Sequence, residues 1–351
     1  MKIVYFVYED VDVASGISKK ISQQITLWKK LGHDVELVSI RKELKSSKVN
    51  KIRFIPVSLK STLLFNQLKK QFDLLNPDIV YMRQMLWFPL LMRILKGYRY
   101  VVEINSDALG EYKKQGFFKY LFHRLTSGFL LNKSTGIVSV SKELLATCSL
   151  SINKSVVIAN GYSFKNPMGV LSSDVRSEQP TKIIFVGSPN QPWHGIDHLE
   201  KIASKCPYFE FHVVMQNYEC KLPNVRCHGA LYGDDLEEMY QMCDIGIGSL
   251  AMYRNDMNEA SPLKTREYLA HGLPVIFGYT DTDLQGLTES DGLLQLPNSP
   301  ENIDCIDQFV DFCNRWKGTR VSSDELVRRL SYENKEVLRL AFFKKISNRD
   351  T

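Results

Sequence analysis

Short runs rich in β-branched and aromatic residues alternate with helix-length segments along the first half of the chain. The runs at 2–8 and 100–104 are almost continuously apolar, which is typical of strands buried on both faces. Such alternation predicts a parallel sheet covered by helices. The strands expected in this half are 2–8, 34–40, 78–82, 100–104, 136–140 and 155–159.

The alternation stops at residues 164–181, where Pro, Gly and Ser replace the apolar periodicity, and then restarts. The strands expected after it are 182–186, 210–215, 225–227, 245–247, 274–277 and 292–296. A chain of 351 residues has room for two domains. The sequence therefore predicts an α/β protein with two Rossmann-like domains, at 1–163 and 182–331, joined by the linker 164–181. The last helix, near 332–351, is expected to pack back on the first domain.

Composition excludes several classes of protein. Lys and Arg number 45 against 39 Asp and Glu, and this small excess is too scattered to indicate a nucleic-acid partner. The seven Cys include no C-x-x-C pair, and the His residues lack metal-binding spacing, so no metal or cofactor is expected. No apolar segment is long enough for a signal peptide or a membrane-spanning helix. We expect a cytoplasmic protein, at most peripheral on the inner face of the cell membrane.

The segment EASPLKTREYLAHGLPV, residues 259–275, carries the clearest functional signal. Ser261 suits an N-cap and Pro262 the first helical position, so a helix is expected from Pro262 to about His271. It follows a strand, so its free N–H groups should lie where an open sheet binds ligands and should favour an anion. Lys264 in the first turn opposes the helix dipole, and a nearby phosphate would reverse that cost. The alternative is a well-capped surface helix without a ligand.

Two carboxylates flank this expected anion site. Glu259 precedes the helix and Glu267 lies within it, in the spacing E-x₇-E. Carboxylates beside a phosphate are unfavourable unless they accept hydrogen bonds from hydroxyl groups. A sugar nucleotide supplies both the phosphates and the hydroxyls, so it is the ligand that this pattern favours.

With these motifs the sequence resembles the GT-B glycosyltransferases of the large retaining family four. The resemblance covers nearly the whole chain and implies two Rossmann-like domains facing across a cleft. It also implies transfer of a sugar, with retention, from a nucleotide-diphosphate donor to a glycan or lipid-linked oligosaccharide in bacterial surface polysaccharide or lipopolysaccharide synthesis. The segments that carry it, besides E-x₇-E, are the loop with Gly16, LGHDVELV, NPDIVYMRQ, GIVSVSKEL, VVIANGYSF, KIIFVGSPNQPWHGIDHL, NVRCHGAL and LEEMYQMCDIGIGS.

The resemblance assigns roles residue by residue. Glu267 matches the glutamate that bonds the ribose hydroxyls, and Glu259 matches the one that contacts and orients the donor sugar. Gly16 matches a glycine that lets the first domain's loop approach the diphosphate. The catalytic residues so implied are Glu259, Asn105, His194 and Lys264. The donor-binding residues so implied are Gly16, Gly187, Ser188, Ser261, Pro262, Leu263, Lys264 and Glu267.

The chain departs from the family pattern at three positions. Many members carry Arg after the glycine at the strand end and Lys six positions later, where this chain has Ser188 and His194. His194 could bind the diphosphate or pack beside Trp193, and charge could come instead from Lys264 and Arg266. A third departure is Asn105, where the family often has His; Asn105 is favoured as a sugar contact, with Asp107 as an alternative.

The stretch at 110–134 interleaves basic and aromatic residues, among them Lys119 and Arg124 with Phe117 and Phe118. An amphipathic helix of this composition could lie in a membrane interface. The alternative is a covering helix whose Leu121, Leu125 and Leu131 pack on the sheet.

Other functions share this pattern. A GT-B sugar-nucleotide epimerase or phosphorylase would use the same donor site with a different second substrate. A sugar-binding or scaffold subunit without activity is the alternative of another class, which the missing Arg and Lys favour.

Overall fold

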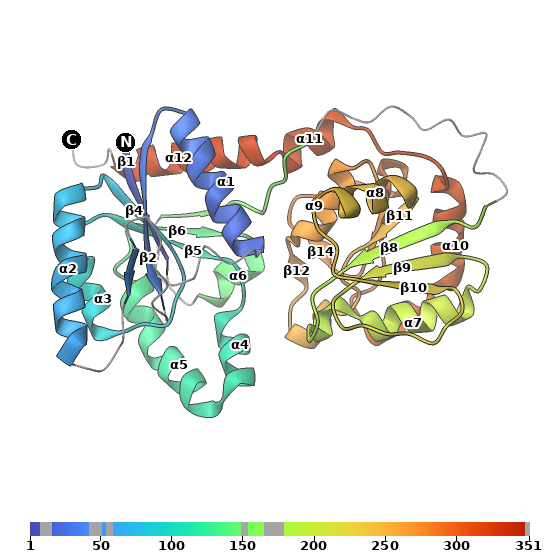
Figure 1. Ribbon diagram of the computed structural model, residues 1–351, viewed down its shortest axis with the longest axis horizontal. Helices are drawn as coiled ribbons and strands as arrows, with labels where there is room; N and C mark the ends of the chain where they lie inside the picture. The colour runs from blue at the N-terminus through green and yellow to red at the C-terminus, as the bar shows by residue number, and fades with distance from the viewer. Residues whose placement is uncertain (8–15, 42–50, 54–58, 149–153, 165–178, 348–351) are drawn as a thin grey trace. The chain divides into compact units, whose positions relative to one another are not determined.

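A computed structural model describes residues 1–7, 16–41, 51–53, 59–148, 154–164 and 179–347. Packing divides the chain into unit 1, Met1–Ile158 with Glu336–Thr351, and unit 2, Ala159–Lys335 (Figure 1). Most of the expected linker at 164–181, and the loop before Gly16, lie outside the described residues. No helix in the described part of the chain is long and apolar enough to cross a membrane.

Unit 1 is built on a seven-stranded parallel sheet in the order β3-β2-β1-β4-β5-β6-β7. All six strands predicted for this half are confirmed, whereas the short β3 was not predicted. The strands are β1 Lys2–Val7, β2 Asp34–Arg41, β3 Lys51–Arg53, β4 Ile79–Arg83, β5 Tyr100–Ile104, β6 Gly136–Ser139 and β7 Ser155–Val157. The helices are α1 Gly16–Lys30, α2 Leu59–Leu75, α3 Pro89–Ile94, α4 Ala108–Gln115, α5 Phe117–Leu131, α6 Lys142–Thr147 and α12 Tyr332–Ser347, the last of which begins in unit 2.

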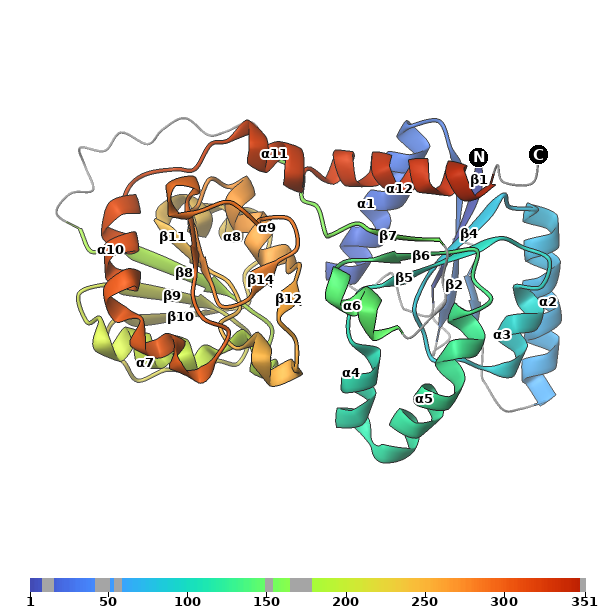
Figure 2. The same ribbon diagram turned by 180° about the vertical axis from the view of Figure 1, so that it is seen from behind.

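Neighbouring residues of β1 anchor helices on opposite faces of this sheet, as the alternation of side chains along a strand requires. Tyr5 stacks on Trp28 of α1 with ring centroids 5.7 Å apart, and Phe6 meets Phe72 of α2 at 5.5 Å. Phe343 of α12 packs on Trp28 at 5.6 Å, so α12 shares the face of α1 (Figure 2). The sheet is therefore buried on both faces, which explains the continuous apolar run of β1.

Unit 2 contains a six-stranded parallel sheet in the order β10-β9-β8-β11-β13-β15 and a small parallel pair, β12-β14. The six predicted strands are confirmed, and the short pair was not predicted. The strands are β8 Lys182–Val186, β9 Glu210–Val214, β10 Val225–Gly229, β11 Ile245–Ile247, β12 Glu259–Ala260, β13 Val275–Phe277, β14 Thr280–Asp281 and β15 Leu293–Gln295. The helices are α7 Ile196–Lys205, α8 Asp234–Met242, α9 Leu263–Ala270, α10 Ile306–Trp316 and α11 Asp324–Leu330, with 3₁₀ turns η2 Pro192–His194, η3 Met252–Asn255, η4 Glu289–Asp291 and η5 Pro300–Asp304.

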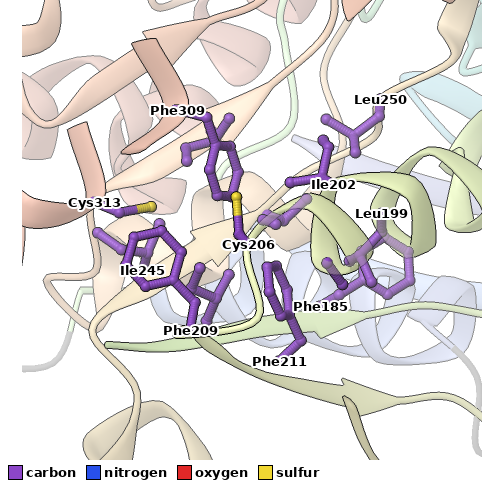
Figure 3. Packing of buried hydrophobic residues seen from close by; sticks show 14 of the residues in the cluster. Phe185, Leu199, Ile202, Cys206, Phe209, Phe211, Ile245, Leu250, Phe309 and Cys313 are labelled. Carbon is purple, nitrogen blue, oxygen red and sulfur yellow. The ribbon is translucent and has the colours of Figure 1, made fainter. Parts of the chain in front are cut away.

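Two hydrophobic clusters cover the two faces of this second sheet. Phe185 of β8 packs among side chains of α7 and α10, including Leu199 and Phe309 (Figure 3). Its neighbour Ile184 belongs to the cluster on the other face, which includes Tyr268 of α9. The chain leaves β8 toward β9 on one side and returns to β11 on the other. The carboxyl ends of β8 and β11 therefore form the switch point at which open α/β sheets bind ligands.

Candidate functional site

Helix α9 is fixed at the carboxyl end of β8 by one of its own side chains. The N–H of Val186 donates a hydrogen bond to the hydroxyl oxygen of Tyr268, at 2.8 Å. The Tyr268 ring packs directly over Gly246 of β11, where a Cβ would lie 2.6 Å from the ring. The fold thus places the first turn of α9, with its free N–H groups, at the switch point between β8 and β11.

Lys264 in that first turn is buried without a counterion. Its Nζ is inaccessible to solvent and finds no hydrogen-bonding partner among the residues that the structure describes. The ammonium lies 4.3 Å from the centroid of the Phe185 ring. Burial lowers the pKa of Lys264 to about 7, because the charged form loses its hydration. An anion beside Lys264 would restore the stability of the charged form.

His194 and Lys264 both contact the ring of Phe185. Its imidazole meets that ring edge-on at 5.7 Å, and it also contacts Trp193 at 6.0 Å. Its Nδ1 is buried with no hydrogen-bonding partner in the described part of the chain. Burial, and then the nearby Lys264, lower the pKa of His194 to about 3. Lys264 therefore lacks the partner that its burial calls for, whereas the imidazole of His194 keeps a hydrogen bond to the backbone of Ser188.

Gly187 makes the approach of His194 possible. A Cβ at Gly187 would lie 2.6 Å from Cε1 of Phe185 and 3.0 Å from Nδ1 of His194, so a larger residue would displace the imidazole. Ser188 follows and is exposed to solvent. The sequence prediction had grouped Gly187, Ser188, His194 and Lys264, and the structure brings Gly187, His194 and Lys264 together around Phe185.

Ser261 differs from its predicted role as a helix cap. The N-cap of α9 is Pro262, and α9 begins at Leu263. The Ser261 hydroxyl oxygen instead accepts a hydrogen bond from the N–H of Asn160 at 2.8 Å, and its carbonyl accepts one from the Asn160 side chain at 2.6 Å. The capping prediction was wrong because Asn160, which is distant in sequence, competes successfully for the hydroxyl.

The prediction that Arg266 supplies charge to the anion site is also wrong, because carboxylates of the protein already neutralise this guanidinium. The fully buried guanidinium bonds both carboxylate oxygens of Asp281 and reaches Asp283 at 3.1 Å. Its Nε donates to the carbonyl of Asn160 at 3.1 Å. Arg266 thus holds the segment after α9 to the segment before it, which is a structural use of the charge, and Lys264 remains the cation of α9 that lacks a counterion.

The two glutamates of E-x₇-E lie on different elements. Glu259 is in β12, whose pairing with β14 fixes the backbone, and its side chain is 8% exposed. Glu267 lies one helical turn after Lys264, so the two side chains share one side of α9. Its Oε1 accepts a hydrogen bond from the Tyr162 hydroxyl at 2.8 Å. Burial and the charge of Glu267 raise the pKa of Tyr162, so Tyr162 stays a hydrogen-bond donor.

Asn105 of unit 1 is held by a lysine. Its Oδ1 accepts a hydrogen bond from Nζ of Lys20 at 2.9 Å, and its side chain also interacts with Glu103. Lys20 also pairs with Glu103 at 3.1 Å. Asp107, the alternative sugar contact, caps α4 by accepting from the N–H groups of Leu109 and Gly110, so its carboxylate has a structural role. Gly16 is the first residue of α1.

Three residues that contact the predicted site residues were not themselves predicted. Tyr162 follows the strand end in VVIANGYSF, and a polar residue after a strand could have signalled it. Phe185, beneath the two basic groups, and Lys20, beside Asn105, give no local signal, because only the tertiary fold brings them to their partners.

The chemistry available in unit 2 is that of anion and hydroxyl recognition. Helix N–H groups, Lys264 and His194 suit phosphates, whereas Glu259 and Glu267 suit hydroxyl donors. Among the residues that the structure describes, no group of three or more His, Cys, Asp or Glu side chains is arranged to hold a metal ion.

The sequence matches no protein-family model and no curated protein. Solved structures do match. Sucrose-phosphate synthase from Thermosynechococcus elongatus shares 13% identity over 99% of both chains, with a TM-score of 0.74. A glycosyltransferase from Rickettsia africae shares 18% over 99% of both chains, with a TM-score of 0.69. Anabaena HepE in complex with UDP and glucose shares 13% over 97% of this chain and 99% of HepE, with a TM-score of 0.68. The chain therefore has the GT-B fold, which confirms the predicted fold class of two Rossmann-like parallel-sheet domains.

Proposed function

We propose that the chain is a retaining glycosyltransferase of family four that uses a nucleotide-diphospho-sugar donor. The observation that supports this most directly is Lys264, whose buried Nζ finds no hydrogen-bonding partner among the described residues, beside His194, whose Nδ1 is also buried without one. They lie at the amino end of α9, where backbone N–H groups add to the positive potential. A diphosphate supplies the missing partner for all of these groups. The similarity to the UDP-bound structure of Anabaena HepE agrees with such a donor.

Each of the two glutamates binds a different part of the donor. Glu267, held by Tyr162 on the same side of α9 as Lys264, accepts hydrogen bonds from the ribose hydroxyls. Glu259, buried in β12, accepts hydrogen bonds from the donor sugar and orients it. The segment Ser261, Pro262, Leu263 lies between them and brings backbone close to the sugar and diphosphate. Gly187 and Ser188 complete the diphosphate site in unit 2.

The acceptor in this proposal is a hydroxyl of a glycan or lipid-linked oligosaccharide of the bacterial surface. Unit 1 supplies its binding residues, among them Asn105, which follows β5 and is held by Lys20. The protein then works in the cytoplasm, where nucleotide sugars are made, and meets lipid-linked acceptors at the inner face of the membrane.

The reaction breaks the bond between the anomeric carbon and the diphosphate oxygen and forms a bond from that carbon to the acceptor oxygen. Negative charge grows on the departing diphosphate, where Lys264, His194 and the N–H groups of α9 stabilise it. The acceptor proton passes to the leaving phosphate. Glu259 positions the sugar and is not the nucleophile.

A panel of nucleotide sugars tests the proposal by thermal stabilisation. A ligand at 100 times its Kd stabilises the fold by about 2.7 kcal/mol, which a thermal melt resolves. The stabilising donor is then incubated with glycan acceptors, and NMR of the product reads the anomeric configuration. We expect transfer with retention that survives EDTA, because protein groups neutralise the diphosphate. Stabilisation without transfer or donor hydrolysis would favour a sugar-binding subunit, and absence of stabilisation by every nucleotide sugar would contradict the donor site.

A further inference from the structure

Helix α5 of unit 1 has apolar residues on two sides, only one of which is packed. Thr126, Leu130 and Leu131 face the interior of unit 1. Leu121 and Leu125, which the covering-helix reading places on the sheet, are 38% and 68% exposed. That reading is therefore wrong for these two leucines, and something else must account for an apolar surface on this helix.

The exposed row follows the spacing of one helix side, with residues four positions apart. Phe117 and Phe118 are 68% and 85% exposed, among the highest values for large apolar side chains in the described residues. Trp87, in the loop after β4, continues the row, with its ring 5.4 Å from that of Phe129. We call this surface the α5 patch; its members on the helix are Phe117, Phe118, Leu121, Phe122, Leu125 and Phe129.

The charged residues in the segment that carries the α5 patch are almost all positive. Residues 108–133 contain one carboxylate, Glu111, against the cations Lys113, Lys114, Lys119, Arg124 and Lys133. Lys119 and Arg124 lie on α5 itself and are exposed. The α5 helix is about 22 Å long at 1.5 Å per residue, long enough for a continuous contact with a flat surface.

We propose that the α5 patch docks on an anionic phospholipid bilayer, with α5 lying in the interface and its phenylalanines among the upper acyl chains. Aromatic rings flanked by Lys and Arg, with a Trp at the margin, are the composition that favours the interface between headgroups and acyl chains. The cations complement the negative surface of such a membrane. This inference does not depend on the proposed function, since docking needs neither donor nor acceptor.

A second copy of the chain is the competing occupant, and the charges argue against it. A two-fold dimer places the same surface against itself, so the cations around one α5 patch would face those of the other. An anionic bilayer instead supplies the opposite charge. The bilayer is therefore the occupant that satisfies both the apolar and the basic residues.

Vesicle co-sedimentation of the full chain tests the proposal. Vesicles of phosphatidylcholine with about 30% phosphatidylglycerol should bind the protein, and pure phosphatidylcholine vesicles should bind it at least about tenfold more weakly. Phe117→Ser with Phe118→Ser should lower binding by about tenfold or more, since both side chains are exposed and the fold does not need them. Leu74→Ser, an equally exposed position on α2 (73%), is the matched control and should bind as the parent does.

Two charge-reversal variants test whether the basic residues of α5 contribute to vesicle binding. Lys119→Glu with Arg124→Glu should weaken binding to the anionic vesicles, whereas Lys29→Glu with Lys30→Glu, an equal reversal of charge on α1, should change it little. Equal loss in both charge variants would overturn the proposal, because it would show attraction by net charge alone.

Quenching by lipids brominated along the acyl chain locates the contact. Bromolipid vesicles should quench the emission of the parent, and Trp87→Phe should remove most of the quenched component. Failure of the parent to bind anionic vesicles, or equal binding by Phe117→Ser with Phe118→Ser, would overturn the proposal. So would a concentration-dependent dimer, seen by sedimentation velocity, that the double serine variant makes monomeric.

Discussion

Lys20 of unit 1 and Lys264 of unit 2 both bury an ammonium group close to the carboxyl end of a central strand, yet their surroundings differ. Lys20 Nζ bonds Glu103 at 3.1 Å and Asn105 at 2.9 Å. Lys264 Nζ has only the Phe185 ring and no hydrogen-bonding partner among the described residues. Burial lowers the pKa of both lysines, and at Lys20 the charge of Glu103 opposes that shift. A charge balanced within the protein serves the fold, and one left unbalanced indicates a ligand.

The ion pair between Lys20 and Glu103 is part of a larger buried network. Arg339 of α12 pairs with Glu103 at 3.2 Å and with Glu336 at 3.0 Å, and Glu336 accepts a hydrogen bond from the Trp28 indole at 2.8 Å. All of these side chains are buried. The network ties α12 to β5 and α1 within unit 1. Its charges therefore hold the C-terminal helix in place and are not available to a substrate.

The largest expected effect comes from unbalancing this network. Glu103→Gln removes the carboxylate that Lys20 and Arg339 share, which leaves Arg339 with Glu336, and should cost about 3 to 5 kcal/mol of unfolding free energy. Urea denaturation measures it, with Glu111→Gln as the exposed control. A cost below about 1 kcal/mol would show that the network does not stabilise unit 1.

The same carboxylate sets an acid limit on stability. Burial alone would raise the pKa of Glu103, but Lys20 and then Arg339 outweigh it and hold that pKa well below its usual range. A depressed carboxyl pKa stabilises the fold above the unfolded pKa, and this contribution is lost as the pH falls below it. The parent should therefore lose stability in acid more steeply than Glu103→Gln does.

Lys264→Met removes the buried ammonium group that has no counterion in the described part of the chain. Removing a buried amine without a counterion should leave the unliganded fold equally or more stable, because no ion pair is broken. Donor kcat/KM should fall several-fold to a thousand-fold, about 1 to 4 kcal/mol for one phosphate-directed group. Lys201→Met, an exposed lysine on α7, is the control and should change neither quantity. A variant that loses stability and keeps its activity would place Lys264 among the structural residues.

The unbalanced lysine also predicts a pH dependence of ligand affinity. With its pKa lowered to about 7 in the free protein, Lys264 is largely neutral above that pH and must take up a proton when an anion binds. UDP affinity should therefore fall by up to about tenfold per pH unit between pH 7 and 9. Calorimetry in buffers of different ionisation enthalpy measures the proton uptake. Lys264→Met should abolish it, and a flat profile in the parent would contradict the assignment.

Much of the fold could be predicted from the sequence because buried parallel strands need near-continuous apolar runs, as β1 and β5 show. The short strands β3, β12 and β14 have two or three residues each, too few for such a pattern. The position of Lys264 in the first turn of a helix after β11 was predictable from local capping and spacing. Its lack of a counterion was not, because only the packing of Phe185 and His194 around it decides that.

The same contrast explains the two corrections in α9. Arg266 and Lys264 are both cations near the start of one helix, and the sequence gives no reason to separate them. Asp281 and Asp283, which balance Arg266, come from the β14 region that no pattern predicted. The prediction for a charged residue is thus limited by whether its partner is near in sequence.

The smallest expected effect concerns Tyr162, which touches a glutamate of the proposed donor site. Its hydroxyl donates to Glu267 at 2.8 Å, and its raised pKa keeps the proton in place at neutral pH. Tyr162→Phe removes one hydrogen bond to a carboxylate and leaves the ring, so the loss should be about 0.5 to 1.5 kcal/mol, at most about tenfold. If Tyr162 positions Glu267 for the ribose, KM for the donor should rise while kcat stays unchanged, because the ribose does not change in the transition state. Glu267→Ala should raise KM further, and the double variant should be no weaker than Glu267→Ala alone, since Tyr162 acts through that carboxylate. A fall in kcat for Tyr162→Phe, or losses that add in the double variant, would show that Tyr162 acts independently of Glu267.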